Sequence, residues 1–209
     1  MRVLPFGDRA ILAEFDGLEE TMGAFRALDA ARLPGVLELV PAARTVLVRL
    51  DPARLSLRAA EQWLLGTPTA GADTQNGPSV TIPVRYDGPD LASTAELLGI
   101  GTAELVSRHS LADWRCAFIG FAPGFAYLVS ADSGLEVPRR STSRQVVPAG
   151  SVGLAGEFTG VYPRSSPGGW QLIGTTSATL WDETRWEEGR EPPSAITPGM
   201  TVRFEVVDG

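Results

Sequence analysis

The spacing of hydrophobic residues over positions 1–66 alternates between the two-residue period of a strand and the wider period of a helix. Residues 18–33 carry apolar side chains at helical spacing, and Ser56 can cap a second helix that runs to Leu65. Four short apolar runs predict strands, at 3–5, 10–14, 36–40 and 45–50. The pattern predicts a small α/β sandwich domain over residues 1–66.

The next twelve residues, 67–78, contain no large apolar side chain and cannot anchor themselves in a core. We therefore predict a linker over 67–78 and a second domain over 79–209. This second domain begins with a strand at 80–84. Two short helices should follow, one capped by Asp90 and ending at Gly99, the other capped by Thr102 and leading to His109.

From Trp114 onward, apolar runs are short and are separated by turn residues, a spacing typical of a β-barrel. These runs lie at 116–121, 145–147, 152–154, 171–173, 178–181 and 201–207. The whole pattern predicts an α+β chain of two domains, an N-terminal α/β sandwich followed by a β-barrel domain.

Residues 118–174 are rich in glycine, proline and aromatic side chains, a composition that favours shaped loops. This region also holds Arg139, Arg140 and Arg144, the densest positive charge in an acidic chain. Arginine forks bind carboxylate or phosphate oxygens at two points, which favours an anionic ligand. The alternative is a solvated turn in which Asp132 and Glu136 pair with these arginines.

Glycines at regular spacing in the run AGSVGLAG (residues 149–156) could expose backbone N–H groups to an anion, but the run lacks the dinucleotide-binding pattern. Neither Ser151 nor Ser166 lies in the strand-to-helix turn of a serine hydrolase. Five aromatic residues could line a pocket, although about half should belong to the core. They are Phe121, Phe125, Tyr127, Tyr162 and Trp170.

The net charge of −7 argues against a surface that binds nucleic acid or an anionic membrane. No apolar run is long enough to span a membrane, and the first residues do not form an apolar signal core, so we expect a cytoplasmic protein. All 18 basic residues are arginine. Without lysine, this chain cannot itself supply a Walker A lysine, a Schiff base or a biotin attachment site.

The chain has one histidine, His109, and one cysteine, Cys116. A single histidine excludes a multi-histidine zinc site, so we predict no metal site. His109 can either hydrogen-bond the last carbonyls of its helix or contact a ligand. Cys116 lies in an apolar run and is expected to be a buried structural thiol.

Five sequence blocks resemble the PxpB/KipI family, which comprises the B subunit of bacterial 5-oxoprolinase and is also described as allophanate hydrolase subunit 1. The blocks are GFAPGFAYL (120–128), PRRSTSR (138–144), VPAGSVGLAG (147–156), TGVYP (159–163) and SPGGWQLIG (166–174). The resemblance extends over nearly the whole chain. It implies that the barrel is cyclophilin-like and that the chain is a subunit of an ATP-dependent amidohydrolase.

The family resemblance implies that 5-oxoproline, a small anionic lactam, is opened to L-glutamate in a complex with PxpC/KipA-like and PxpA-like partners. ATP and Mg would be held by the complex rather than by this chain alone. Catalytic roles are expected for His109, Arg139, Arg140 and Arg144. Substrate contacts are expected from Gly120, Phe121, Pro123, Gly124, Tyr127, Pro148, Gly150, Ser151, Gly156, Tyr162, Gly168, Gly169 and Trp170.

The chain departs from the family pattern at three positions. Ala126 replaces a frequent proline, Phe158 a frequent glutamine, and Thr175 a frequent arginine, so an amide and a guanidinium are missing from the expected pocket. Two alternatives share the fold: a KipI-like inhibitor that binds a sensor histidine kinase, and a carboxyltransferase-type subunit of a urea or allophanate pathway.

Overall fold

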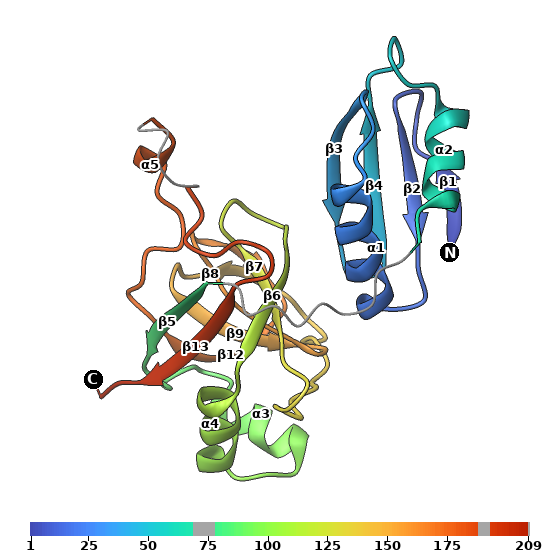
Figure 1. Cartoon of the computed structure of the whole chain (residues 1–209). Helices are drawn as coiled ribbons and strands as arrows, with labels where there is room; N and C mark the ends of the chain where they lie inside the picture. The colour runs from blue at the N-terminus through green and yellow to red at the C-terminus, as the bar shows by residue number, and fades with distance from the viewer. Residues whose placement is uncertain (69–77, 188–192, 209) are drawn as a thin grey trace. The chain divides into compact units, whose positions relative to one another are not determined.

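The computed structural model describes residues 1–68, 78–187 and 193–208, which fold into two compact units. Unit 1 comprises Met1–Gln75 and unit 2 comprises Asn76–Gly209 (Figure 1). Residues 69–77 of the predicted linker lie outside the described residues, so the linker stays a prediction.

Unit 1 is an antiparallel sheet packed against two helices. Its strands are β1 (Arg2–Pro5), β2 (Ala10–Glu14), β3 (Val36–Pro41) and β4 (Thr45–Leu50), in the order β1-β2-β4-β3. Helix α1 (Leu18–Ala30) contacts β3 and β4, and α2 (Leu57–Gly66) contacts β2. The Ser56 hydroxyl accepts a hydrogen bond from the Ala59 N–H, as its predicted capping role requires. The predicted α/β sandwich is confirmed.

Unit 2 is built on a sheet that, within the described residues, has seven strands in the order β12-β9-β10-β7-β6-β13-β5. The strands are β5 (Ser79–Val84), β6 (Trp114–Ile119), β7 (Ala126–Val129), β9 (Ser151–Ala155), β10 (Phe158–Val161), β12 (Gln171–Thr175) and β13 (Thr201–Val206). A separate ribbon pairs β8 (Arg144–Val147) with β11 (Ser166–Gly168). Inward-facing apolar side chains of this sheet, among them Trp114, Leu128 and Val202, are fully buried.

The two edge strands of this sheet meet along a seam and bring the barrel close to closure. Arg85, directly after β5, exchanges two backbone hydrogen bonds with Thr175 of β12. The N–H of Gly88 then donates to the carbonyl of Ile173 at 3.2 Å, and the N–H of Asp90 to that of Leu172 at 2.9 Å. Pairing these edges removes exposed hydrogen-bonding groups that an open sheet would present. The predicted α+β fold with a barrel domain is confirmed.

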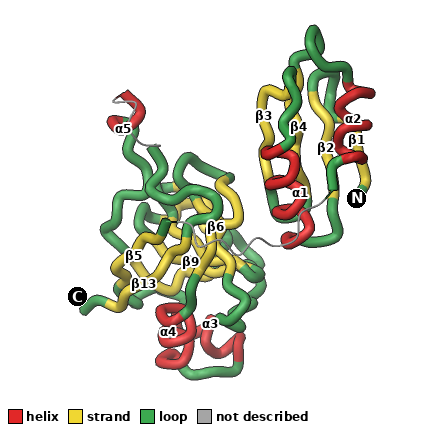
Figure 2. The backbone as a smooth tube through the Cα atoms, viewed as in Figure 1, coloured by secondary structure: helices red, strands yellow, loops and turns green. Residues whose placement is uncertain are grey.

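Three helices belong to the described part of unit 2. Helices α3 (Leu91–Leu98) and α4 (Thr102–Leu111) lie together beside the barrel, and α5 (Thr184–Glu187) is a single turn on a distant loop (Figures 1 and 2). Gly99 adopts the left-handed conformation that ends α3, as predicted. The α4 cap is Gly101 rather than the predicted Thr102.

Asp90 does not cap α3 with its side chain, contrary to the sequence prediction. It stands at the cap position, but its carboxylate turns away from the helix and contacts the barrel. Strands β7, β10 and β11 were not predicted, because all three lie in the region 118–174, whose glycine and proline content favours loops; β10 and β11 themselves contain such residues, whereas β7 does not. The predicted strand at 178–181 is instead a loop with one bridge, from Trp181 to Ser194.

The seam gives the first testable prediction. A Cβ atom added at Gly88 would lie 2.3 Å from backbone atoms of Ile173 and Leu172, so Gly88→Ala must push the two edges apart. We expect a loss of about 3 kcal/mol in the free energy of unfolding of unit 2. Calorimetry of the full chain would measure this loss. Gly120→Ala is the control, since its nearest neighbour atom lies at 3.7 Å; an equal loss there would contradict the prediction.

Candidate functional site

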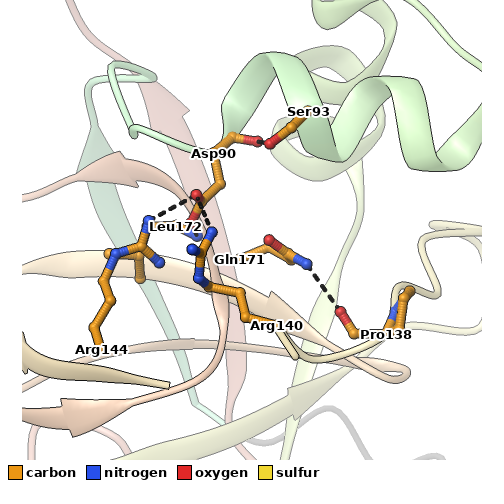
Figure 3. Close-up of polar contacts among 7 residues, drawn as sticks. All are labelled: Asp90, Ser93, Pro138, Arg140, Arg144, Gln171 and Leu172. Atoms are coloured by element: carbon orange, nitrogen blue, oxygen red, sulfur yellow. Dashed lines mark hydrogen bonds and ion pairs between the residues drawn. The ribbon is translucent and has the colours of Figure 1, made fainter. Parts of the chain in front are cut away.

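The carboxylate of Asp90 is the centre of a polar network that joins the seam to the arginine-rich segment 138–144 (Figure 3). Its Oδ1 atom accepts hydrogen bonds from Nη1 of Arg140 at 2.8 Å and from Nη2 of Arg144 at 2.7 Å. Its Oδ2 atom accepts from the backbone N–H of Leu172 at 2.7 Å. The Asp90 side chain is 5% exposed, so a buried charge is here matched by two guanidinium groups.

The network sets the charge state of Asp90. Burial by itself would raise the pKa of this carboxyl group. The hydrogen bond from Arg144, the N–H of Leu172 and the charges of both arginines outweigh burial and hold the pKa below its ordinary value. Asp90 is therefore ionised at neutral pH, and both of its carboxylate oxygens accept hydrogen bonds from Arg140, Arg144 and the N–H of Leu172.

The segment 138–141 is also attached to the barrel through its backbone. The N–H of Arg140 donates to the carbonyl of Gly169 at 2.8 Å, and Nε2 of Gln171 donates to the carbonyl of Pro138 at 3.1 Å. These contacts, together with the Arg140–Asp90 ion pair, hold the segment at both ends. Arg139 lies between them and is exposed.

The three arginines of the predicted anion site therefore differ in what they can bind. Arg140 and Arg144 are paired with Asp90, and not with Asp132 or Glu136 as the alternative proposed. Arg139 forms no ion pair or hydrogen bond within residues 1–68, 78–187 and 193–208. Of this trio, Arg139 is the one without an ion pair in the described part of the chain, so its guanidinium can bind an anionic ligand; Nε of Arg140 and Nη1 of Arg144 are buried without a hydrogen-bond partner.

A pocket of about 510 Å³ adjoins this network. Its walls are the segment 138–141 and one face of α3, which contributes Ser93, Glu96 and Leu97; Gln171 of β12 also lines it. A pocket of this size is large enough for a small ligand.

The predicted aromatic pocket divides into core and surface. Phe125, Tyr162 and Trp170 are buried in an apolar cluster. The ring centroid of Phe125 lies 5.2 Å from that of Tyr162 and 5.2 Å from that of Trp170. Tyr127 is half-buried; burial raises its pKa, and the nearby charge of Arg139 partly opposes this. Phe121 is 59% exposed and has a φ of 67°, an uncommon conformation for a residue with a side chain.

Most of the predicted glycine contacts are contacts within the protein. The N–H groups of Gly150 and Gly156 donate to the carbonyls of Tyr162 and Val137, and so are not free to bind an anion. A Cβ atom added to Gly150 would lie 2.2 Å from the carbonyl oxygen of Thr176. A Cβ atom added to Gly168 would lie 2.2 Å from the hydroxyl oxygen of Tyr162. These glycines let two parts of unit 2 approach each other closely, and do not open the backbone to a ligand.

The remaining predicted contacts are dispersed over unit 2. Gly120, Pro123 and Gly124 belong to the loop between β6 and β7, and Gly124 packs on Trp181. Pro148 is exposed after β8, whereas Ser151 is buried in β9. Gly169 is buried and an added Cβ would lie 2.8 Å from the Ser143 hydroxyl. None of these residues lines the pocket beside Arg139.

His109 is fully buried inside unit 2 and has partners for both ring nitrogens. The hydroxyl of Thr159 donates its one proton to the Gly153 carbonyl, so it must accept from Nε2–H of His109 at 2.8 Å. The other nitrogen, Nδ1, then accepts from the Tyr86 hydroxyl at 2.7 Å. The histidine partners are thus side-chain hydroxyls and not the helix carbonyls that the sequence suggested.

Burial lowers the pKa of His109 to about 3, so the ring is neutral at physiological pH. It also stacks on Phe204 with 4.4 Å between ring centroids. This geometry gives His109 a structural position, and we do not carry it into the proposed site. Cys116 is likewise buried, with a pKa raised to about 12 by burial, as expected of a structural thiol.

Two residues of the network were missed as functional candidates. Asp90 was interpreted as a helix cap, and Gln171 as a strand residue. The missing signal is spatial, because Asp90 lies 50 and 54 residues from its arginine partners along the chain. A carboxylate was to be expected near the arginine cluster, but any of the 25 Asp and Glu residues could have been the partner, and the sequence does not indicate which.

The three residues that depart from the family pattern all lie in unit 2, where each has defined surroundings. Phe158 packs in the aromatic cluster, with its ring centroid 5.5 Å from that of Tyr127. The Thr175 hydroxyl donates to the carboxylate of Asp87 at 2.8 Å, at the seam. Ala126 is buried in β7.

Among the described residues, no cluster of three or more His, Cys, Asp or Glu side chains could hold a metal ion. A search of the same residues for helices that could cross a membrane finds none long and apolar enough.

An α/β unit followed by a barrel unit makes up the region of the chain that matches a carboxyltransferase-type domain. Residues 1–190 match the family described as "Carboxyltransferase domain, subdomain C and D", and the chain belongs to this family. It is 42% identical over 176 residues to the B subunit of 5-oxoprolinase from Escherichia coli O157:H7, and the match covers 82% of this chain and 78% of that protein. The predicted membership of the PxpB/KipI family is confirmed.

Solved structures agree on the fold. The crystal structure of TTHA0988 aligns with a TM-score of 0.75 and 35% identity, covering 96% of this chain but 40% of that one. This chain therefore spans less than half the length of that relative. The urea amidolyase of Kluyveromyces lactis aligns with a TM-score of 0.78 at 20% identity, over 98% of this chain and 15% of that one. At this identity the alignment shows the fold alone.

The buried carboxylate gives the second prediction. Asp90→Asn keeps the side-chain shape but leaves two partly buried guanidinium groups without a counter-charge, and should cost unit 2 about 3 kcal/mol at pH 7. Because the folded-state pKa is lowered, the contribution of Asp90 is present above the unfolded-state pKa of about 3.9 and fades as the pH falls below it. Chemical denaturation at pH 7 and near pH 3 would measure both effects.

The control for this prediction is Asp113→Asn, which removes another aspartate paired with an arginine, Arg203. Both members of that pair are more than half exposed, so the change should be far smaller. An equal loss for both variants, or a loss for Asp90→Asn that does not shrink as the pH falls from 7 to 3, would contradict the role assigned to Asp90.

The third prediction concerns the pH dependence that His109 confers. In the unfolded chain this histidine binds a proton below about pH 6.5, whereas the folded form stays neutral down to about pH 3. Stability should therefore fall on acidification between these values, by up to about 1.4 kcal/mol per pH unit from this group. His109→Gln should be less stable at pH 7 but should lose less on acidification to pH 4.5. Parallel slopes for the two proteins in urea unfolding would refute this.

Proposed function

We propose that this chain is the B subunit of an ATP-dependent 5-oxoprolinase, which opens 5-oxoproline to L-glutamate together with PxpC/KipA-like and PxpA-like partners. The observation that carries the proposal is the 42% identity with the B subunit of a bacterial 5-oxoprolinase, of which the chain covers 78%. The proposed enzyme is active as a hetero-oligomeric complex in the cytoplasm, where ATP is available.

The chemistry gives Arg139 its proposed role. Opening the lactam at the expense of ATP creates negative charge on phosphate and carboxylate oxygens. Arg139 lines the pocket beside α3 and has no protein anion of its own in the described part of the chain, so its guanidinium can stabilise that charge. Arg140 and Arg144 act differently: through Asp90 they position the segment that carries Arg139.

We propose that ATP and Mg are held mainly by the partners. The lysine-free sequence supports this placement, since a phosphate-binding lysine must come from elsewhere. The run AGSVGLAG supports it too, because its Gly150 and Gly156 N–H groups are hydrogen-bonded to protein carbonyls. Bound ATP would supply the phosphoryl group that activates the lactam, while Arg139 would hold negative charge at the pocket.

The test is reconstitution of the full chain with its PxpC/KipA-like and PxpA-like partners, with and without 5-oxoproline. The proposal predicts ATP hydrolysis that depends on 5-oxoproline and is matched by glutamate release. Absence of turnover in a complex shown to have assembled would contradict the proposal. It would direct attention to the kinase-binding or carboxyltransferase alternatives, which binding to a sensor kinase or to a biotinylated partner would then separate.

The fourth prediction is made in this reconstituted system. Arg139→Ala should lower kcat/KM by about 10²- to 10³-fold, the usual cost of removing a group that stabilises developing charge. Arg203→Ala is the matched control, an exposed arginine on β13 outside the pocket. Unfolding curves should be unchanged for Arg139→Ala. Normal turnover of this variant would remove Arg139 from the site.

A further inference from the structure

The pocket beside Arg139 has walls from three separate parts of unit 2. Ser93, Glu96 and Leu97 share one face of α3, as residues three and four apart on a helix do. The segment 138–141 forms another wall, and Gln171 of β12 contributes a side chain that is almost completely buried. The Asp90 network ties these elements together, because it contacts the start of α3, the arginine segment and β12 (Figure 3).

The polar groups of this pocket are only partly used by the protein. The amide nitrogen of Gln171 is committed to the Pro138 carbonyl, which fixes the orientation of the amide. Its Oε1 atom accepts no hydrogen bond from the residues that the structure describes. A fixed side-chain carbonyl next to a pocket is a ready acceptor for a ligand N–H group.

The pocket is lined by charged side chains of opposite sign that come from different elements. Glu96 comes from α3 and Arg139 from the arginine segment, and both are exposed. They are not paired with each other, and over the described ranges neither forms an ion pair with any other residue. Arg140, the other charge in the pocket, is paired with Asp90, which it shares with Arg144. Arg139 and Glu96 are therefore the charged side chains of the pocket that have no ion pair in the described part of the chain.

We infer that this pocket binds a small zwitterion of the α-amino-acid class, with Arg139 holding the carboxylate and Glu96 the ammonium group. A guanidinium fork matches a carboxylate at two points, and an ammonium group is a compact charge that can donate to both Glu96 and the Gln171 carbonyl. The volume of about 510 Å³ leaves room for a side chain against Leu97.

The inference rests on the proposed function and deepens it. The nitrogen of 5-oxoproline is a neutral amide, whereas ring opening produces an ammonium group on L-glutamate. Glu96 then distinguishes the product from the lactam, because both forms can donate an N–H to its carboxylate but only the ammonium group of the ring-opened form also makes an ion pair with it. The pocket is thus assigned to the ring-opened amino acid.

Isothermal titration calorimetry of the full chain would test the inference, with L-glutamate, glutarate and 5-oxoproline as ligands. Glutarate has the carbon chain and both carboxylates of glutamate but lacks the ammonium group. We expect L-glutamate to bind about tenfold more tightly than either other ligand. Glu96→Gln should abolish this preference, and Arg139→Ala should weaken the binding of all three.

The matched control is Glu205→Gln, an exposed glutamate on β13 outside the pocket, which should bind as the wild type does. Equal affinity of the wild type for L-glutamate and glutarate, or no saturable binding of L-glutamate, would overturn the inference. So would a glutamate preference that survives in Glu96→Gln. The titration contains no ATP and no partner proteins, so failure here and failure of 5-oxoproline turnover are separate results.

Discussion

The buried carboxylate of Asp90 is the interaction on which the rest of unit 2 depends. An ionised group that is 5% exposed is costly unless several donors surround it, and Arg140, Arg144 and the Leu172 N–H provide them. These donors come from different parts of the chain, so satisfying one charge fixes the barrel seam, the start of α3 and the arginine segment at once. The arrangement leaves Arg139 as the arginine of this segment that lines the pocket without an ion pair in the described part of the chain.

The glycine-rich sequence has a related explanation. Gly88, Gly150 and Gly168 stand where other backbone or side-chain atoms approach within 2.3 Å of a would-be Cβ atom. Glycine is required there because two parts of the barrel cross, and a methyl group would separate them. Of these three, Gly150 belongs to the run AGSVGLAG that suggested a cradle for an anion, and it packs against the Thr176 carbonyl instead. The proposed ligand contacts are therefore side chains around the pocket, chiefly Arg139 and Glu96.

In the proposed complex, this chain and its partners would have different roles. This chain offers a pocket lined by Arg139 and Glu96, neither of which has an ion pair in the described residues, and its neutral, buried His109 contributes to the core. Phosphate chemistry would fall to the partners. Membership of the carboxyltransferase C and D family is consistent with such a role, because relatives such as TTHA0988 carry the same fold within a longer chain. The fold alone does not define the substrate, which is why Arg139 and Glu96 are the residues to test.

The sequence by itself determined the α+β class, the elements of unit 1, the Ser56 cap and the family, since these depend on local periodicity and on contiguous sequence blocks. It also singled out the arginine segment. Only the tertiary structure decided which arginine is available, because Asp90 lies 50 residues away from Arg140 and local rules interpret it as a cap. Strands β7 and β10 were not predicted, because both lie in the glycine- and proline-rich region 118–174, which local rules interpret as loops; pairing with neighbouring strands, such as Thr159 of β10 with Leu128 of β7, places them in the barrel.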